Sequence, residues 1–541
     1  MKGTDKKGQS AKSKMQTDTD TDNRHTARSK GDRQKIAKSK QTQTRITDTP
    51  SGIKGTDNII DKELDEIMNE PIENVDPSFF DQTIRSLNHA KMLESAQTFG
   101  TPHYLLNREI LEQRAKLFSE TMNKYLPQGR FFYAFKCNDL PMQVKILKDI
   151  GFFADVAGIF ELQLALKLGF ERIVFSSPGK SEEELSLAIK NKKQVIVNID
   201  NHDELLRMKS LAGIASLAGN KKTTQKIKVG FRLNSEPFTT NEWTKFGFEL
   251  DQLKQAVEEI NQTPNMEWAG LHFHCSWNKN PKKYLENIKR IGEYLSTHFS
   301  PAQLKQFRFL DIGGGFYPEN QAIINKIQDR GIVLDTIGAR LGDKNRVYKE
   351  ANFDPYSFAV TPVEPLEDFA REISHAIEAY ILPLNPGIEI FFEPGRFIAT
   401  FATSILLSVL AVKKHCVILD GGINMLGDYK FTEYSFAPVV NLSRLDSELS
   451  ESFSARVPIK THRTLLYGPL CDPNDLWGYT YYGSEIRKGD VLAVLNQGAY
   501  TFCTAWRFIK PIPPYICLSG DDLVIAKEAE PFESRYARCR F

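Results

Sequence analysis

Residues 130–136, RFFYAFK, open a series of short apolar runs that decides the fold. Seven further runs follow in order: FFADV (152–156), RIVFSS (172–177), QVIVNID (194–200), KVGFRLN (228–234), GLHFHCS (270–276), RFLDIGGG (308–315) and IEIFFEPGR (388–396). Runs that are apolar at nearly every position predict β-strands buried on both faces. Amphipathic helical patterns separate most of them, as at 141–150, 160–168 and 181–189. Eight such units over roughly 270 residues predict an α/β fold, a (β/α)8 TIM barrel, with an open doubly wound sheet as the alternative.

The segments on either side of these runs differ in composition. We predict a disordered, polar and basic tail at 1–60, whose first fifty residues contain no Leu, Val, Phe, Tyr or Trp. A helical segment is expected at 61–107, ending in the strand TPHYLLN, which would join a second domain. The barrel is predicted at 108–396, with a partly helical insertion at 317–365 over its C-terminal mouth. The runs VILDGGIN, DVLAVLN, AYTFCTAW and DDLVIA predict a mostly β domain at 397–541.

The overall composition is that of an ordinary globular protein, with 41% hydrophobic residues and a formal net charge of +2. This balance argues against nucleic acid or a membrane surface as a partner. The apolar run at 397–412 is shorter than the roughly 20 residues of a membrane span, and it predicts buried β-strands. Seven widely spaced cysteines indicate neither a zinc site nor a disulfide framework. We therefore expect a cytoplasmic protein with no resident metal.

Polar residues stand where the predicted barrel strands end, and this fold gathers its functional groups at the C-terminal ends of strands. One such residue alone is more often a solvated strand end, but here they recur: Lys136, Asp155, Ser177, Asp200, Arg232, His274, Gly313, Gly314, Gly315, Glu393 and Arg396. Successive glycines allow backbone amides to approach an anion, and barrels often bind phosphate after strands seven and eight. A lysine, a phosphate cradle, a carboxylate and a histidine at one barrel mouth predict pyridoxal 5'-phosphate as the cofactor.

Seven motifs carry a family resemblance. They are FYAFKCN (132–138), ADVAGIFE (154–161), HFH (272–274), DIGGGF (311–316), EPGR (393–396), GPLCDPND (468–475) and GAYT (498–501). In this order they are similar to the motifs of the ornithine/diaminopimelate/arginine decarboxylase family, which are fold-type III pyridoxal-phosphate enzymes related to alanine racemase. The resemblance spans roughly residues 100–510. It implies decarboxylation of a small-molecule amino acid, which we expect to be basic, a diamino acid or a derivative.

The resemblance also implies roles for individual residues. Lys136 would form a Schiff base with the cofactor, and Glu393 would keep the ring nitrogen protonated so that the ring stabilises a quinonoid carbanion. His274 would stack on the ring, and the other cofactor contacts would come from Asp155, Arg232, Ser276, Gly313, Gly314, Gly315, Gly395, Arg396 and Tyr500. Glu161 would line the imine side, together with Asp155 and Arg232, and help to position the lysine. Cys471 would protonate the α-carbon from the second subunit of a homodimer with shared active sites. Substrate contacts are expected from Asp472, Glu433 and Tyr500.

Two departures indicate a divergent member of that family. Trp277 stands where the family usually has a serine, so Ser276 is expected to take over its contact with the phosphate. The segment DGGINMLGDYKFTEYSF lacks the tyrosine–aspartate pair of the ornithine enzymes, which leaves the amino acid open. The fold also hosts racemases, but those place an arginine at the ring nitrogen, and Glu393 favours decarboxylation. The remaining alternative is a catalytically silent homologue that binds a partner protein, against which the retained lysine and cysteine motifs argue.

Overall fold

The computed structural model describes the chain in segments, all within one compact unit that spans residues 70–541. The described residues are 87–218, 226–235, 245–319, 322–324, 358–360, 363–413, 416–426, 439–445, 461–462, 465–473, 475–478, 481–482 and 485–540. The predicted tail at 1–60 lies outside them, as does most of the predicted insertion at 317–365.

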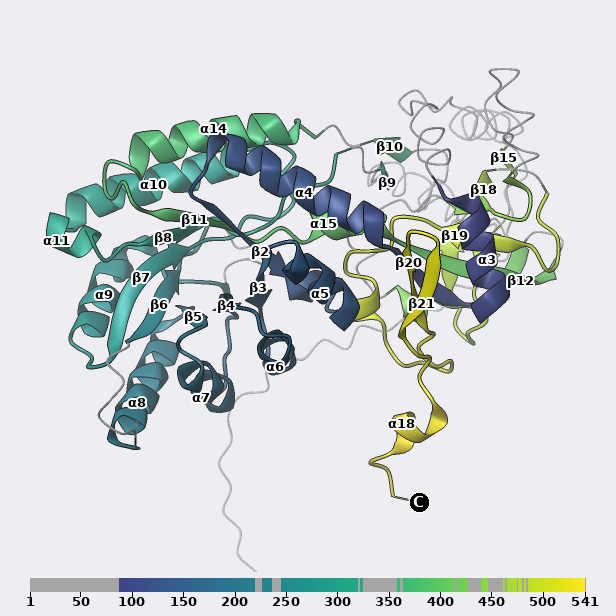
Figure 1. The fold of residues 1–541 in the computed structure, drawn as a ribbon, viewed down its shortest axis with the longest axis horizontal. Coiled ribbons are helices and arrows are strands. Elements are labelled where there is room, and N and C mark those ends of the chain that lie inside the picture. The colour runs from purple at the N-terminus through teal and green to yellow at the C-terminus, as the bar shows by residue number, and fades with distance from the viewer. Residues whose placement is uncertain are drawn as a thin grey trace, which may run out of the picture. The chain divides into compact units, whose positions relative to one another are not determined.

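Eight parallel strands form a closed barrel, which confirms the predicted fold class (Figure 1). Each predicted run overlaps one strand, although β7 begins four residues before its run: β2 (Gly129–Ala134), β3 (Phe153–Val156), β4 (Ile173–Ser176), β5 (Val195–Ile199), β6 (Ile227–Arg232), β7 (Met266–His272), β8 (Phe309–Asp311) and β11 (Glu389–Phe392). The barrel closes because β11 pairs with both β2 and β8. Closure excludes the open doubly wound sheet.

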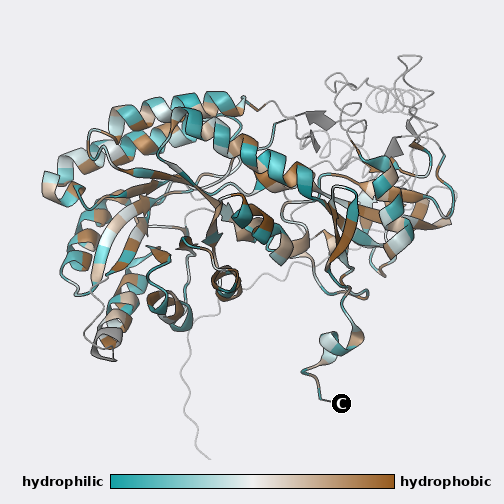
Figure 2. Ribbon diagram, in the orientation of Figure 1, coloured by the Kyte–Doolittle hydropathy of each residue, from teal (hydrophilic) through white to brown (hydrophobic). Residues whose placement is uncertain are grey.

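Helices follow the strands and cover the outside of the barrel: α4 (Arg108–Tyr125), α5 (Pro141–Asp149), α6 (Ile159–Lys167), α7 (Glu182–Lys190), α8 (His202–Ala218), α9 (Leu253–Asn261), α10 (Lys282–His298), α11 (Pro301–Leu304) and α14 (Leu366–Tyr380). A capping box of Ser181 and Glu184 fixes the start of α7, because each side chain accepts a bond from the other's backbone N–H. Helix α14 lies between α10 and α4 (Figure 1). In Figure 2 the barrel strands are largely brown and the helices carry both colours, as expected for helices with one buried face.

The interior of the barrel contains an apolar layer. The rings of Phe309 and Phe391 stack with their centroids 4.5 Å apart. Their cluster is completed by Phe132, Val174, Ile196 and Ala269. Gly270 leaves room for this layer, since a Cβ there would lie 2.5 Å from the Phe309 ring. The layer fills the barrel below the site, as in a packed core rather than a pore.

A polar layer lies directly above the apolar one. Alternate residues of a strand face the same side, so residues two positions beyond the apolar layer also face the interior. Asp311 and Glu393, two positions after Phe309 and Phe391, are buried and polar, and so are Asp155, Arg232 and His272 on the other strands. His272 lies opposite Arg232 on β6 and Asp311 on β8 in the strand register. The alternation along the strands therefore places a charged floor under the barrel mouth.

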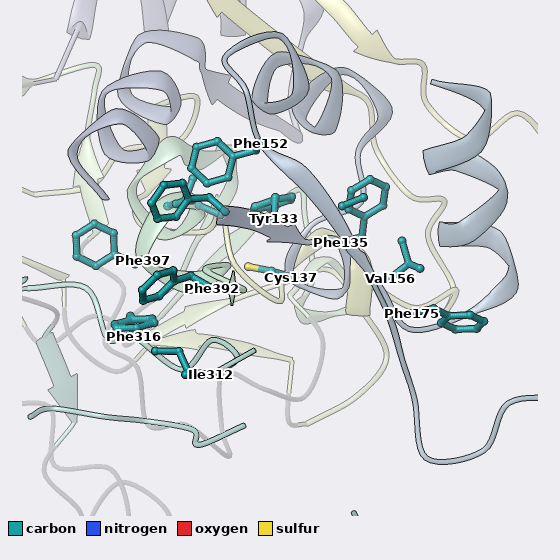
Figure 3. Packing of buried hydrophobic residues seen from close by; sticks show 14 of the residues in the cluster. Tyr133, Phe135, Cys137, Phe152, Val156, Phe175, Ile312, Phe316, Phe392 and Phe397 are labelled. Carbon is teal, nitrogen blue, oxygen red and sulfur yellow. The ribbon is translucent and has the colours of Figure 1, made fainter. Parts of the chain in front are cut away.

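The outer face of the barrel packs through aromatic rings onto α4. Phe118 of α4 lies 5.0 Å from Phe316 and 5.4 Å from Phe397, measured between ring centroids. Figure 3 shows Phe316, Phe392 and Phe397 close together beside the turn that carries Cys137. This packing fixes the last barrel strand, and with it the segment that carries Glu393.

The second domain is a mostly β domain, as predicted. Its main sheet has the order β17-β16-β13-β12-β1-β20-β21, with β19 also pairing with β12 and β14. The strands are β1 (His103–Asn107), β12 (Thr403–Val412), β13 (Cys416–Leu419), β14 (Val439–Asn441), β16 (Leu465–Tyr467), β17 (Leu476–Gly478), β19 (Val491–Val494), β20 (Tyr515–Ser519) and β21 (Asp522–Lys527). Strand β1, from the segment before the barrel, lies between β12 and β20.

Shorter elements complete the described residues. Strands β9 (Ala322–Ile324) and β10 (Phe358–Val360) pair with each other, as do β15 (Thr461–His462) and β18 (Tyr481–Tyr482). The helices outside the barrel layer are α3 (His89–Phe99), α15 (Arg396–Ala399) and α18 (Phe532–Tyr536). The 3-10 turns are η1 (Phe135–Cys137), η3 (Leu250–Gln252), η4 (Thr400–Ala402), η5 (Ile423–Met425) and η6 (Phe502–Thr504). Among the described residues no helix has the length and apolar character to cross a membrane.

Two strand predictions are wrong. In the run 397–412, only Thr403–Val412 forms a strand, and the preceding residues form α15 and η4. The helical turns let the chain leave the barrel and enter the sheet, and Thr400 stabilises them through a hydroxyl bond to the carbonyl of Arg396. The run AYTFCTAW forms η6 rather than a strand. Its backbone bonds to the barrel instead, because Tyr500 N donates to the carbonyl of Cys137.

Candidate active site

Lys136 and Asp155 form the centre of the site. Lys136 lies in η1, immediately after the first barrel strand, and Asp155 lies on β3, where it pairs with Ala134 at the end of β2. The Lys136 Nζ donates to Oδ2 of Asp155 at 3.0 Å, and the side chains are 34% and 1% exposed. Burial lowers the pKa of Lys136, but the charges of Asp155 and Glu393 outweigh it and raise the pKa overall. Burial and the charge of Glu393 raise the pKa of Asp155.

Glu393 follows the last barrel strand and is 1% exposed. Burial favours the neutral acid, but His272 and Lys136 outweigh it and lower the pKa of Glu393. Oε2 lies 3.6 Å from Nε2 of His272 and 3.9 Å from Nδ1 of His274. Neither carboxylate oxygen has a hydrogen-bond partner among the described residues. Such orphaned, buried and ionised oxygens are costly, so they indicate a group that binds there.

His274 is held in one tautomer. Burial and the nearby charge of Lys136 lower its pKa, so the imidazole is neutral. Gly314 N donates to Nδ1 at 3.2 Å, which makes Nδ1 the acceptor. Nε2 therefore carries the proton and donates to the Ser276 hydroxyl at 3.0 Å. The ring is thus fixed at the barrel mouth by two bonds.

The glycine turn after β8 is forced by close packing. Gly313 and Gly315 have φ of +71° and +87°, a region that favours glycine. A Cβ on Gly314 would lie 2.3 Å from the carbonyl oxygen of Glu393, and one on Gly315 would lie 1.8 Å from that of Cys275. Two of the amides predicted to face phosphate already donate within the protein, Gly313 N to Asp311 and Gly314 N to His274. The turn therefore orients the neighbouring site residues Asp311 and His274.

Arg232 is buried at the end of β6. Its guanidinium lies over the ring of Phe246, with Cζ 4.2 Å from the centroid. Nε stands 3.9 Å from Asp200 and has no hydrogen-bond partner among the described residues. Burial lowers its pKa, partly offset by Asp200 and Glu393. Arg232 supplies positive charge to the floor of the site.

Residues of the β domain reach the lysine turn. Arg396 lies with its guanidinium 4.8 Å from the centre of the Tyr500 ring. Tyr500 has φ of +55° and donates its backbone N–H to Cys137 at 2.8 Å. A Cβ on Gly395 would lie 2.8 Å from Cβ of Cys137, so only glycine allows this approach. The thiol of Cys503 donates to the carbonyls of Lys136 and Cys137, both at 3.2 Å.

The other predicted residues are Glu161, Cys471, Asp472 and Glu433. Glu161 Oε2 accepts from the backbone of Ala157 at 2.6 Å, at the start of α6. Cys471 is exposed, and Asp472 is partly exposed in the same loop. Asp475 orders that loop by accepting from Leu470 N and Ile423 N. The predicted substrate residue Glu433 lies outside the described residues.

Three contributors to the site were not predicted as site residues: His272, Asp311 and Cys503. Asp311 lies two positions beyond Phe309 of the apolar layer, so the period-two pattern could have revealed it, and His272 lies two positions beyond Gly270 on the neighbouring strand. Donor atoms of His272, His274 and Glu393 all lie within 4.8 Å of one another, close enough to share one small ligand group. For Cys503 we find no sequence signal, because its role depends on a contact between domains.

The residues present fit pyridoxal phosphate. Lys136 offers an amine at the barrel mouth, and Glu393 offers orphaned carboxylate oxygens that suit a protonated ring nitrogen. His274 offers a neutral, fixed ring, and Arg396 adds a cation for the phosphate. This barrel, with a lysine after its first strand and a carboxylate after its last, has the architecture of a fold-type III pyridoxal-phosphate enzyme.

Comparisons with known proteins agree with a pyridoxal-phosphate site. Residues 111–341 match the family model "Pyridoxal-dependent decarboxylase, pyridoxal binding domain". The diaminopimelate decarboxylase of Aquifex aeolicus is 25% identical over 463 residues, which cover 81% of this chain and 92% of that protein. The crystal structure of diaminopimelate decarboxylase from Helicobacter pylori, complexed with L-lysine, has a TM-score of 0.62 at 22% identity, over 82% of this chain and 98% of that one. Lysine/ornithine decarboxylase from Vibrio vulnificus, complexed with putrescine, has a TM-score of 0.57 at 22% identity, over 80% and 98%. Residues 111–341 therefore match the pyridoxal-binding domain of pyridoxal-dependent decarboxylases, and the chain as a whole is similar to pyridoxal-phosphate-dependent amino acid decarboxylases.

Proposed function

We propose that the protein decarboxylates an amino acid that carries a second amine, with pyridoxal phosphate attached at Lys136. The observation that carries the proposal is the pair of opposed groups in the barrel mouth. On one side Lys136 bonds to Asp155, and on the other Glu393 is buried, ionised and without hydrogen-bond partners in the described chain. An amine and an orphaned carboxylate in these places suit the two ends of a pyridoxal ring.

Each residue of the site then has a specific role. Pyridoxal phosphate, when bound, supplies a ring that withdraws the electron pair left behind by departing CO2. Glu393 holds a proton at the ring nitrogen, and Asp155 orients the amine of Lys136. His274 faces the ring as a neutral imidazole, fixed by Ser276 and Gly314. This arrangement favours loss of CO2 over racemisation, since a racemase needs a ring nitrogen that stays neutral.

We assign the phosphate to the side of the barrel mouth where Arg396 supplies a positive charge. Arg396, Tyr500 and the glycine turn hold it in this proposal, with Gly395 allowing the close approach of the lysine turn. The hydroxyl of Ser276 is already engaged with His274, so its main task is to orient that ring. Trp277, which is 47% exposed with φ of +63°, borders the same loop.

A second copy of the chain completes the site in this proposal. Cys471 is exposed and makes no hydrogen bond within the described part of its own chain, so it is available to another subunit. There it would deliver a proton to the α-carbon, and Asp472 would face the distal amine of the substrate. Two-fold pairing would supply both sites of a homodimer at once. The names of the relatives, diaminopimelate and lysine/ornithine decarboxylases, support a substrate with a cationic end.

Release of labelled CO2 tests the proposal. Purified protein with pyridoxal phosphate is offered carboxyl-labelled meso-diaminopimelate, L-lysine, L-ornithine and L-arginine, with L-glutamate as a substrate lacking the second amine. We expect CO2 from at least one of the four and little from glutamate, and none from the Lys136→Ala variant. Exchange of the α-proton without CO2 would show a racemase, and neither reaction with any of the four would contradict the proposal.

A further inference from the structure

His272 is a buried polar residue that the mechanism above does not use. It ends β7, it is 1% exposed, and neither ring nitrogen has a hydrogen-bond partner among the described residues. Its register neighbours are Arg232 on β6 and Asp311 on β8, which are also buried. A buried histidine whose ring nitrogens make no hydrogen bonds destabilises the fold unless a nearby group supplies a partner.

That nearby group is Glu393. Nε2 of His272 lies 3.6 Å from Oε2 of Glu393, slightly beyond hydrogen-bond distance. A shift of less than about 1 Å would bring Nε2 and Oε2 within hydrogen-bond distance. Both Glu393 oxygens lack a partner in the described chain, and a ring nitrogen can satisfy only one of them. His272 is therefore placed to satisfy the other.

We propose that His272 is a positioning residue for Glu393: its Nε2–H donates to Oε2 and leaves Oε1 aimed at the ring nitrogen of the cofactor. The inference rests on the proposed role of Glu393. Without this bond the carboxylate could rotate or take up a proton, and it would no longer hold the ring nitrogen protonated. His272 thus controls how strongly the ring withdraws electrons, although it does not touch the ring.

The charges around His272 favour its neutral form, which can still donate a hydrogen bond. Burial lowers the pKa of His272, and Arg232 and Lys136 act in the same direction, while Glu393 opposes them. A neutral imidazole still has one N–H to donate. Burial and the charge of Glu393 also raise the pKa of Asp311. Glu393 is therefore the ionised group beside a protonated acid, Asp311, and a neutral histidine, His272.

The test measures the protonation state of the cofactor's ring nitrogen in addition to the rate of turnover. Holoenzymes are prepared with pyridoxal phosphate labelled with nitrogen-15 in the ring, and the chemical shift of that nitrogen reports whether it is protonated. The variants are His272→Phe, which removes the donor, His272→Gln, which keeps an N–H donor, and Glu393→Gln. His103→Phe makes the same exchange at an equally buried histidine of β1, where Ser95 and Gly100 are the bonding partners.

The inference predicts a protonated ring nitrogen in the wild type, His272→Gln and His103→Phe. It predicts a neutral one in Glu393→Gln and His272→Phe, with decarboxylation reduced about tenfold or more in His272→Phe. If His272→Phe does not fold, His272→Met removes the donor with a smaller side chain and gives the same reading.

Failure of this inference can be distinguished from failure of the proposed function. A protonated nitrogen in His272→Phe or His272→Met, together with a neutral one in Glu393→Gln, overturns the inference and leaves the proposed function standing. A protonated nitrogen in Glu393→Gln overturns both the inference and the role of Glu393. A neutral nitrogen in His272→Gln alongside His272→Phe shows that the imidazole packs rather than donates, and it also overturns the inference.

Discussion

Nζ of Lys136 lies 3.0 Å from Oδ2 of Asp155, an aspartate that is almost completely buried. Asp155 lies on β3 and pairs with Ala134, the last residue of β2, and Lys136 follows two residues later in η1. Because the carboxylate stabilises the ammonium form, Asp155 and Glu393 raise the pKa of Lys136. Attachment of the cofactor needs the free amine, so this ion pair sets the pH range over which the apoprotein can be loaded.

Asp155→Asn should shift that range. Removing the negative charge lowers the pKa of Lys136, so more free amine is present at a given pH. The midpoint of the pH profile for cofactor attachment should move down by about one unit or more. The measurement is the rise of visible imine absorbance after pyridoxal phosphate is added to apoprotein. Glu389→Gln, at the opposite end of β11 beside Arg172, is the matched control and should leave the midpoint in place.

Glu393→Gln should keep the cofactor but lose most of the chemistry. The neutral amide cannot hold a proton on the ring nitrogen, and such preorganised charges are worth roughly a hundredfold in rate or more. Bound cofactor is measured by absorbance, and CO2 release gives the rate. A loss below tenfold would show that the carboxylate is only structural.

The stability of the barrel should depend on a second lysine. Lys180 and Glu204 are both fully buried, and Nζ of Lys180 donates to Glu204 at 2.8 Å and to the carbonyls of Ser177 and Asn198. Lys180→Met leaves Glu204 as an uncompensated buried charge, which should cost about 3–5 kcal/mol in the free energy of unfolding. Urea unfolding measures the loss. Adding Glu204→Leu should restore most of it, and a single-variant loss below about 1 kcal/mol would refute the argument.

Shared active sites predict complementation between two inactive variants. Lys136→Ala lacks the cofactor lysine, and Cys471→Ala lacks the proton donor. Under subunit exchange, random mixing makes about half of the dimers mixed, each with one intact site, so activity should recover to roughly a quarter of the wild-type value. No recovery in demonstrably mixed dimers would mean that Cys471 serves its own barrel or is not the donor.

The barrel was predictable because its strands are buried on both faces and so are apolar at nearly every position. Lys136 and Glu393 were predictable from the rule that chemistry gathers at strand ends. His272 was missed because the predicted run 270–276 placed the end of the strand near His274, whereas β7 ends at His272. The strand predicted in AYTFCTAW failed for another reason: Tyr500 and Cys503 bond to the lysine turn, and this tertiary contact overrides the local β propensity.

The most direct test of the account is the position of the cofactor on the chain. The purified protein, loaded with pyridoxal phosphate, is reduced with borohydride, digested and mapped by mass spectrometry. We expect a stable pyridoxyl group on Lys136 and no comparable label elsewhere, including the fully buried Lys180. A label on another lysine, or none on a protein that still releases CO2, would contradict the assignment of the site.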